Sequence, residues 1–132
     1  MIVVDSGIWI DYFNGVDSIQ TAFLDRLLDG PDLLVGDLII AEVLRGFDRE
    51  WEYRQAERAM RSLNAISVSD PDTAFAAARH HRHLRSLGFT VRKTVDILIA
   101  TRCIADGHAL LHRDRDFQPF IDHLGLLDAM TL

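Results

Sequence analysis

The chain has 132 residues, of which 48% are hydrophobic, and this is enough for one domain with its own core but too few for two. Its 20 acidic residues against 14 lysines and arginines give a formal net charge of −6, which argues against a predominantly basic nucleic-acid-binding surface. The sequence has neither an apolar run of the ~18 residues that a membrane span requires nor a signal-peptide pattern, and its single cysteine, Cys103, fits a buried thiol in a reducing cytoplasm.

Short apolar segments alternate with segments of helical periodicity, without repeats or linkers, so we expect one domain over residues 1–132. The expected elements, in chain order, are a strand at 2–4, helices at 7–13 and 17–28, a strand at 33–35, helices at 37–44 and 50–63, an extended segment at 66–68, helices at 71–87 and 94–106, a strand at 109–112, a helix at 117–123 and an edge strand at 126–127. Strands without polar alternation, separated by helices, indicate an α/β fold with a parallel sheet of four or five strands and helices on both faces.

Capping residues mark several of these helix ends. Asp37 is expected to cap the helix that ends at Leu44, and Asp70 followed by Pro71 is a strong start for the helix at 71–87. The glycines expected just after a helix are Gly30, Gly88 and Gly107. The residues expected to face inward from the helix at 50–63 are Trp51, Ala56, Met60 and Leu63.

Acidic residues stand where this fold class places its ligand sites, beyond the carboxyl ends of the strands. Asp5 directly follows the first strand, and Asp114 and Asp116 follow the strand at 109–112. Glu42 and Asp96 interrupt apolar stretches of two helices. Because ionised carboxylates lose several kcal/mol of hydration when buried, each of these acids needs a partner or a position in a pocket.

Each acid also has an alternative structural role. Asp5 and Asp116 are each placed to cap the helix that follows, and Asp96 lies in a first turn, where the helix dipole favours an anion. Glu42 has Arg45 three residues later as an ion-pair partner. These roles explain the residues singly, but not why the predicted architecture brings all of them to one edge of the sheet.

A cluster of carboxylates stays ionised only with a cation among them. All-oxygen ligation suits Mg²⁺ or Mn²⁺ rather than zinc. Such a metal neutralises a phosphate, lowers the pKa of an attacking water and stabilises a leaving oxygen, which is the equipment for hydrolysing a phosphodiester.

Four stretches of the chain, in this order, resemble the motifs of the PIN-domain ribonucleases, and specifically of the VapC toxins of toxin–antitoxin pairs. The stretches are Ile2–Ile10 (IVVDSGIWI), Leu38–Gly46 (LIIAEVLRG), Thr94–Ala100 (TVDILIA) and Leu111–Phe117 (LHRDRDF). The resemblance implies a metal-dependent endoribonuclease that uses metal-activated water and leaves 5′-phosphate and 3′-hydroxyl ends.

The resemblance also implies a role for each acid. It assigns Asp5 and Asp96 as direct metal ligands, Glu42 as a ligand through water or the group that orients the nucleophile, Asp114 as the acid that completes the site, Asp116 as an auxiliary acid, and Ser6 as a hydroxyl that positions a water. Gly7 and His112 depart from the residues common in the family, without removing a carboxylate.

The same resemblance implies partners: an RNA substrate such as tRNA or a ribosomal loop, a second copy of the chain in a homodimer, and a small VapB antitoxin. In this family the antitoxin's C-terminal segment wraps the helices near the site and often inserts a basic side chain among the carboxylates. The acidic N-terminal half of this chain is consistent with a basic partner segment, and equally with plain solubility.

A basic strip between positions 79 and 93 is the second candidate feature, for binding phosphates of a substrate. It consists of Arg79, Arg82, Arg85, Arg92 and Lys93, with no acid among them. The alternative is an ordinary solvated helix face.

A histidine group and two tryptophans favour structural roles. His80, His81 and His83 lack the i,i+4 spacing of helical metal sites, so packing or solvated positions are expected, with His81 partly buried. Trp9 and Trp51 are expected to anchor packing, or, for Trp51, to line an antitoxin groove.

Three other classes of protein compete with a nuclease. A receiver-like signalling domain needs a lysine after its last strand, but the only lysine, Lys93, stands at a helix start. A haloacid-dehalogenase-type phosphatase needs Asp-x-Asp after its first strand, where this chain has Asp5-Ser6-Gly7. A non-catalytic PIN-like scaffold that only binds partners is expected to lack carboxylates, and none is missing here.

Overall fold

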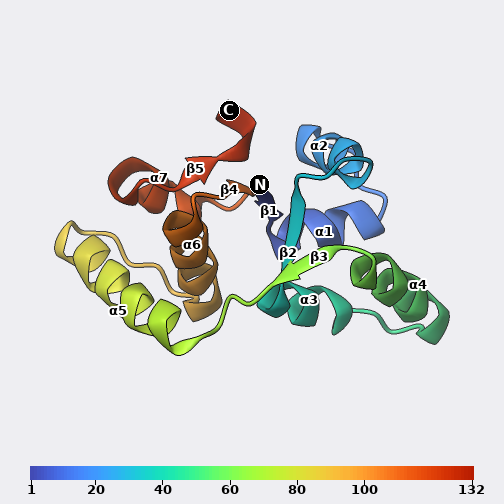
Figure 1. The fold of residues 1–132 in the computed structure, drawn as a ribbon, viewed down its shortest axis with the longest axis horizontal. Coiled ribbons are helices and arrows are strands. Elements are labelled where there is room, and N and C mark those ends of the chain that lie inside the picture. Colours follow the sequence, from blue (N-terminus) through green and yellow to red (C-terminus); the bar gives the residue numbers. More distant parts are fainter.

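The computed structural model describes residues 1–132 and contains one five-stranded sheet in the order β3-β2-β1-β4-β5 (Figure 1). The strands are β1 (Ile2–Val4), β2 (Leu33–Gly36), β3 (Asn64–Ile66), β4 (Ala109–Leu111) and β5 (Leu127–Asp128). All four neighbouring pairs are parallel, and Ile2 of β1 lies opposite Leu33 on one side and Ala109 on the other. The expected parallel sheet is therefore confirmed.

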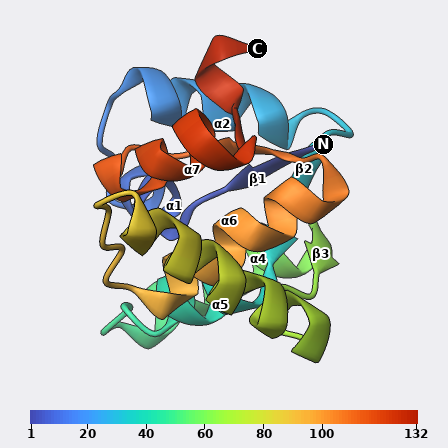
Figure 2. The same ribbon diagram turned by 90° about the vertical axis from the view of Figure 1, so that its left-hand side faces the viewer.

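Helices cover both faces of this sheet, as Figures 1 and 2 show. The helices on one face are α1 (Ser6–Phe13), α2 (Ile19–Leu28), α3 (Asp37–Leu44) and α4 (Glu50–Arg61). Those on the other are α5 (Pro71–Ser86), α6 (Thr94–Asp106) and α7 (Gln118–Leu124), and two short 3₁₀ helices, η1 (Arg115–Phe117) and η2 (Ala129–Thr131), follow β4 and β5. None of the helices has the length and apolar character that crossing a membrane requires.

The direction of chain travel across the sheet reverses between β1 and β4. The connections after β1 and β2 lead outward to β2 and then β3, whereas the chain next returns to β4, on the opposite side of β1, and ends at β5. The carboxyl ends of β1 and β4 therefore flank the switch point at which open α/β sheets bind ligands. Asp5 comes directly after β1, and Asp114 follows β4 after a short turn.

The centre of the sheet supplies much of a core of 28 buried hydrophobic residues. Residues of β1, β2 and β4 are buried because helices lie on both faces, which explains their unbroken apolar sequences. Strand β3 is an edge strand with Asn64 and Ala65 exposed, so it has no such run. For this reason the expected extended segment at 66–68 is displaced from the observed strand.

One of the two expected aspartate caps is confirmed and the other is wrong. Asp70 caps α5 by accepting a hydrogen bond from the N–H of Thr73 at 2.8 Å. At α3 the residue in the cap position is Gly36, and Asp37 is the first helical residue. Asp37 instead uses its Oδ1 to accept from the N–H of Val68 at 2.8 Å, which ties the chain beyond β3 to the start of α3.

Of the three glycines expected just after a helix, two are confirmed as helix ends and one is wrong. Gly88 and Gly107 adopt positive φ angles of 95° and 70° after α5 and α6, as a C-terminal glycine cap does. Gly30 does not have a positive φ, since α2 already ends at Leu28 with Asp29 as its cap.

The two tryptophans differ in burial, and so do the outcomes of their predictions. Trp9 is 1% exposed and stacks on Phe13 with ring centroids 5.9 Å apart, so its role as a packing anchor is confirmed. The inward position expected for Trp51 is wrong, because its surface is 58% exposed. The buried face of α4 is set by Ala56 and Met60, and Trp51, five residues before Ala56, is turned about 140° away from it.

Candidate active site

Asp5 is the residue that joins β1 to α1. Its N–H donates to the carbonyl of Leu111 at 2.9 Å, which extends the pairing of β1 with β4 to the site. It occupies the N-cap position of α1, but its side chain makes no capping hydrogen bond. The residue is 7% exposed, and its Oδ1 is buried without any hydrogen-bond partner. The alternative in which Asp5 serves α1 as a side-chain cap is therefore not what the structure contains.

Two helices direct further carboxylates to the same place. Asp96 lies in the first turn of α6 and is 6% exposed, with its Oδ2 buried and unpartnered. Glu42, on α3, is half-buried, and its Oε1 is likewise buried and unpartnered. Arg45 makes no ion pair with it, so the alternative role for Glu42 is also absent.

The segment after β4 contributes the remaining acids. Asp114 Oδ1 accepts from the N–H of Asp116 at 2.9 Å and so caps η1, which turns both side chains toward the same region. One carboxylate oxygen from each of Asp96, Asp114 and Asp116 lies within 4.8 Å of the others. Asp116 does not cap α7, which begins after Phe117 without a side-chain cap.

The electrostatics of the site reflect burial and mutual repulsion. Desolvation raises the pKa of Asp5 to about 6, with further increases from Glu42 and Asp114, although the N–H groups of Ser6 and Gly7 offset part of the shift. Desolvation, followed by the charge of Asp5, raises the pKa of Asp96 to about 7. Both acids are thus held in a state in which ionisation is disfavoured unless a cation compensates.

These residues fit a divalent metal ion. Buried carboxylate oxygens without hydrogen-bond partners are costly in a folded protein, and here Asp5, Glu42 and Asp96 each have one. The grouping of Asp96, Asp114 and Asp116 oxygens adds a spacing at which one ion can contact several carboxylates. The donors are all oxygen, which suits Mg²⁺ or Mn²⁺.

The five cations of the basic strip are all exposed, and none of them makes an ion pair. Lys93 stands at the start of α6, three residues before Asp96, and its charge lowers the pKa of Asp96. Arg92 precedes it, whereas Arg79, Arg82 and Arg85 lie along α5. Ser6 is the first residue of α1, half-buried beside Asp5.

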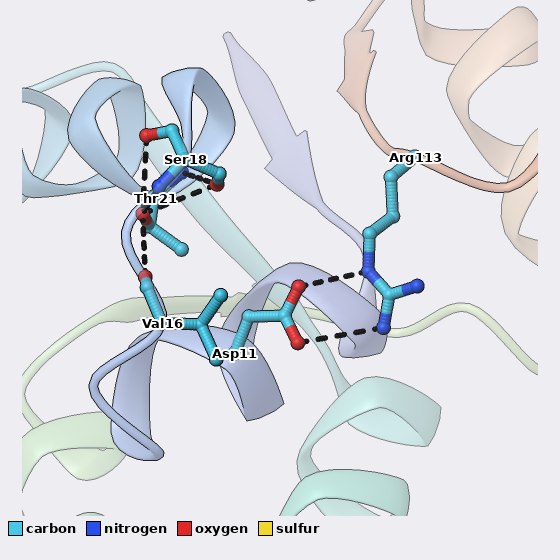
Figure 3. A network of polar contacts seen from close by, with 5 residues as sticks. All are labelled: Asp11, Val16, Ser18, Thr21 and Arg113. Carbon is cyan, nitrogen blue, oxygen red and sulfur yellow. Dashed lines mark hydrogen bonds and ion pairs between the residues drawn. The ribbon is translucent and has the colours of Figure 1, made fainter.

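A clamp that the sequence did not reveal holds the segment after β4 against α1. Arg113 pairs with Asp11 through two contacts, Nε to Oδ2 at 2.9 Å and Nη2 to Oδ1 at 3.5 Å (Figure 3). The guanidinium also packs close to Gly7. A Cβ added at Gly7 would lie 3.5 Å from Arg113 Nε, at ordinary van der Waals distance. Arg113 therefore fixes the residue before Asp114 over the first turns of α1.

Two hollows flank η1 beside the acids. One, of about 390 Å³, is bordered by Asp116 and by the chain between α5 and α6, and the other, of about 280 Å³, is bordered by Asp114 and His112. Arg115 and Gln118 border both. A larger hollow of about 480 Å³ lies between α1 and the start of α4 and contains none of the five acids.

The histidines of α5 do not form a joint site. His80 Nδ1 lies 3.2 Å from the hydroxyl of Thr101, and burial lowers the pKa of His80. His81 is half-buried, as expected, and His83 is exposed. The contact of His80 with Thr101 and the exposure of His83 correspond to the structural and solvated roles expected for these histidines.

Comparisons with known proteins give a consistent result. The model of the family described as "PIN domain" matches residues 2–120. The chain is 34% identical over 119 residues to VapC ribonuclease Mb1587 of Mycobacterium bovis and to Ribonuclease VapC11 of Mycobacterium tuberculosis, covering 89% of this chain and of each relative.

Solved structures share the fold at lower identity. VapBC2 from Rickettsia felis, bound to a DNA fragment from its promoter, superposes with a TM-score of 0.74 at 19% identity, with 96% of both chains covered. A toxin–antitoxin complex from Klebsiella pneumoniae superposes with a TM-score of 0.71 at 18% identity, again with 96% of both chains covered.

Proposed function

The chain belongs to the PIN-domain family, among the VapC ribonucleases, and from this premise we propose that it is the toxin of a toxin–antitoxin pair and cuts RNA with the help of a divalent metal ion. The observation that carries the proposal is the set of buried, unpartnered carboxylate oxygens on Asp5, Glu42 and Asp96 at the switch point of the sheet. A structural ion-pair network would have supplied these oxygens with partners.

We propose that Asp5, Glu42, Asp96 and Asp114 hold the metal, with Asp116 as an auxiliary acid, and we take Mg²⁺ or Mn²⁺ as the ion. When bound, such an ion neutralises phosphate charge and lowers the pKa of a coordinated water. In this proposal Glu42, on α3, orients that water, and Ser6 supplies a hydroxyl beside Asp5. Because the carboxylates are assigned to the metal in this proposal, we propose direct attack by the metal-activated water, without a covalent intermediate.

The basic strip completes the proposal on the substrate side. An RNA backbone that approaches the acids needs cations beyond them, and Arg79, Arg82, Arg85, Arg92 and Lys93 have no partners within the chain. Contacts of this kind to phosphates give affinity without sequence selectivity. The net charge of −6 means that this local strip, rather than the whole surface, attracts RNA.

Further parts of the proposal concern assembly and place. We propose that residues 1–132 form one PIN domain, that two copies associate as a homodimer, and that a VapB-type antitoxin silences the enzyme. A structured RNA such as tRNA is the proposed substrate, and the cytoplasm is the proposed place of action because such RNA is found there.

The test is cleavage of total tRNA by the antitoxin-free protein with Mg²⁺ or Mn²⁺, beside an EDTA control and an Asp96→Asn variant. We expect discrete products that disappear in both controls. Cleavage that survives both controls would mean a contaminating nuclease, and absence of cleavage together with no binding of Mg²⁺ by the folded protein would favour the alternative of a non-catalytic, partner-binding PIN domain.

A further inference from the structure

The chain between α5 and α6 carries an exposed aromatic ring that the proposed chemistry does not use. Phe89 is 38% exposed although it is a large apolar side chain, and it lies beside His123 with ring centroids 5.2 Å apart at 41°. Figure 2 shows β1 running toward the left-hand edge of the molecule, where the chain between α5 and α6 also lies, below α7. Phe89 and Asp116 line the same hollow, which places Phe89 on the edge of the sheet that carries the acids.

Phe89 borders the hollow of about 390 Å³ that reaches Asp116. This volume is within the range of roughly 300–1,000 Å³ of small-ligand sites, and one nucleobase is smaller than that. Because Asp116 also contributes an oxygen to the acid cluster, a group in the hollow is next to the position where a phosphate would be cut. The hollow therefore shares Asp116 with the proposed active site.

The other borders of the hollow are polar in a way that suits a nucleotide. Arg115 supplies a cation for a phosphate. Gln118 Nε2 donates to Asp122 Oδ1 at 2.9 Å, which leaves its amide oxygen as an acceptor for the exocyclic amine of a base. Thr90 and Val91 also border the hollow, and Arg92 and Lys93 of the basic strip follow them directly in the chain.

We infer that this hollow binds an unpaired nucleobase of the RNA, adjacent to the cut phosphate, with Phe89 as the stacking platform. The inference deepens the proposed ribonuclease function and rests on it. RNA-binding sites commonly stack unstacked bases on aromatic side chains while arginines hold the backbone, and this combination is present here around one hollow. Phe89 is a substrate-positioning residue in this scheme, so the enzyme selects RNA whose bases are free to leave a helix.

The test uses fluorescence anisotropy with a fluorescein-labelled, ten-nucleotide, mixed-sequence single-stranded RNA, in an Asp96→Asn background that prevents cutting. We expect Phe89→Ala to weaken binding about fivefold or more, the low end for one stacked base, and Phe89→Trp to bind as tightly as the parent. The same RNA in a duplex should bind without sensitivity to Phe89. Phe75 is the matched control, since it is 68% exposed on the first turns of α5, and Phe75→Ala should change binding less than twofold.

Equal binding by Phe89→Ala and its parent would overturn the inference, as would equal losses from Phe75→Ala and Phe89→Ala, or no binding of the single strand by the parent. Cleavage assays with Asp96 intact separate this result from the proposed function. Cutting that is unaffected by Phe89→Ala leaves a ribonuclease without this base site. Stacking-dependent binding without any cutting leaves the base site and removes the nuclease. Weakened antitoxin binding with unchanged RNA binding would assign the ring to a protein partner and contradict the inference.

Discussion

Helix α6 carries an aspartate near each end, and the fold treats the two in opposite ways. Asp96, in the first turn, is buried with an unpartnered oxygen. Asp106, in the last turn, pairs with Arg102 at 2.7 Å, and Arg102 pairs in turn with Asp70 at 3.0 Å. The helix dipole favours an anion at the first position and disfavours one at the second, so the dipole alone would predict the reverse.

The amino-terminal edge of the sheet pairs its acids, whereas the carboxyl edge leaves them buried without partners. At the amino-terminal edge, Asp70 caps α5 and holds Arg102, and these contacts lower the pKa of Asp70, with the Thr73 hydrogen bonds as the largest cause. At the carboxyl edge, burial raises the pKa of Asp5 and Asp96. Paired acids stabilise the fold, whereas the unpaired ones cost stability that the proposed metal ion would return on binding.

The largest expected difference between the edges is in catalysis. Asp96→Asn should lower RNA cleavage on the order of 10³-fold, equivalent to the several kcal/mol that metal-ion catalysis supplies, and should abolish the rise in melting temperature on adding Mg²⁺. Asp106→Asn, ten positions later on α6, should leave the rate of RNA cleavage within twofold of the parent's. It should also leave the rise in melting temperature on adding Mg²⁺ in place. Initial rates and thermal melts measure the two effects, and equal losses from the two variants would contradict the division of roles.

The pH dependence of stability should also differ between the edges. In metal-free protein with EDTA, Asp5 and Asp96 have pKa values of about 6 and about 7, above the unfolded value near 3.8. The folded state therefore holds more protons than the unfolded state between about pH 4 and 7, so the free energy of unfolding falls as pH rises through this window. The slope has an upper limit of about 1.4 kcal/mol per pH unit for each group.

The pKa of Asp70 is lowered, so its contribution has the opposite sign: it is present above about pH 4 and is lost only as pH falls further. Thermal melts from pH 4.5 to 7.5 isolate the carboxyl edge. Asp96→Asn should reduce the slope, and saturating Mg²⁺ should flatten it. A melting temperature that rises across this window in EDTA would show that the two acids are not destabilised by burial.

Arg102→Ala tests the role of the ion pairs at the amino-terminal edge. This change removes the guanidinium shared by Asp70 and Asp106 and should lower the melting temperature by about 3–6 °C, on the order of 1 kcal/mol for a partly exposed network. Cleavage at a temperature well below the melt should be unchanged. Loss of cleavage by folded Arg102→Ala protein would mean that this edge also supports catalysis.

Much of the fold could be predicted because burial leaves a pattern in the sequence. The strands β1, β2 and β4 are buried on both faces, and their sequences are therefore unbroken apolar runs. Strand β3 and the face of α4 that carries Trp51 depend on what lies beside them in space, which no local pattern records. The capping role predicted for Asp37 is wrong, because the carboxylate accepts from the N–H of Val68, 31 positions away, and no local pattern reveals this partner.

The acids of the site were predictable for a related reason. A carboxylate in an apolar stretch, such as Asp96, conflicts with its surroundings, and the conflict is visible without coordinates. Features made by distant exposed residues were not visible. Arg113 and Asp11 are 102 positions apart, and Phe89 lies near His123 only in the folded chain. Which oxygens have no partner also follows from packing alone.

The smallest expected effect belongs to Arg113, the one clamp at the carboxyl edge. Its side chain is 55% exposed, so loss of the pair with Asp11 should change the free energy of unfolding by no more than about 0.5 kcal/mol. Cleavage should fall more than stability, about two- to fivefold for Arg113→Ala, because the residue before Asp114 then loses its anchor on α1 and small displacements of positioned groups are costly in rate (Figure 3).

A double-mutant cycle separates positioning from general loss of positive charge. Asp11→Ala should reduce cleavage as much as Arg113→Ala, and the double variant should be no worse than either, because both remove the same contact. Arg45→Ala removes an exposed arginine that makes no ion pair, and it should leave cleavage unchanged. Additive losses in the double variant would mean that Arg113 acts directly on the RNA, and the carboxyl edge would then be held in place by its backbone and caps alone.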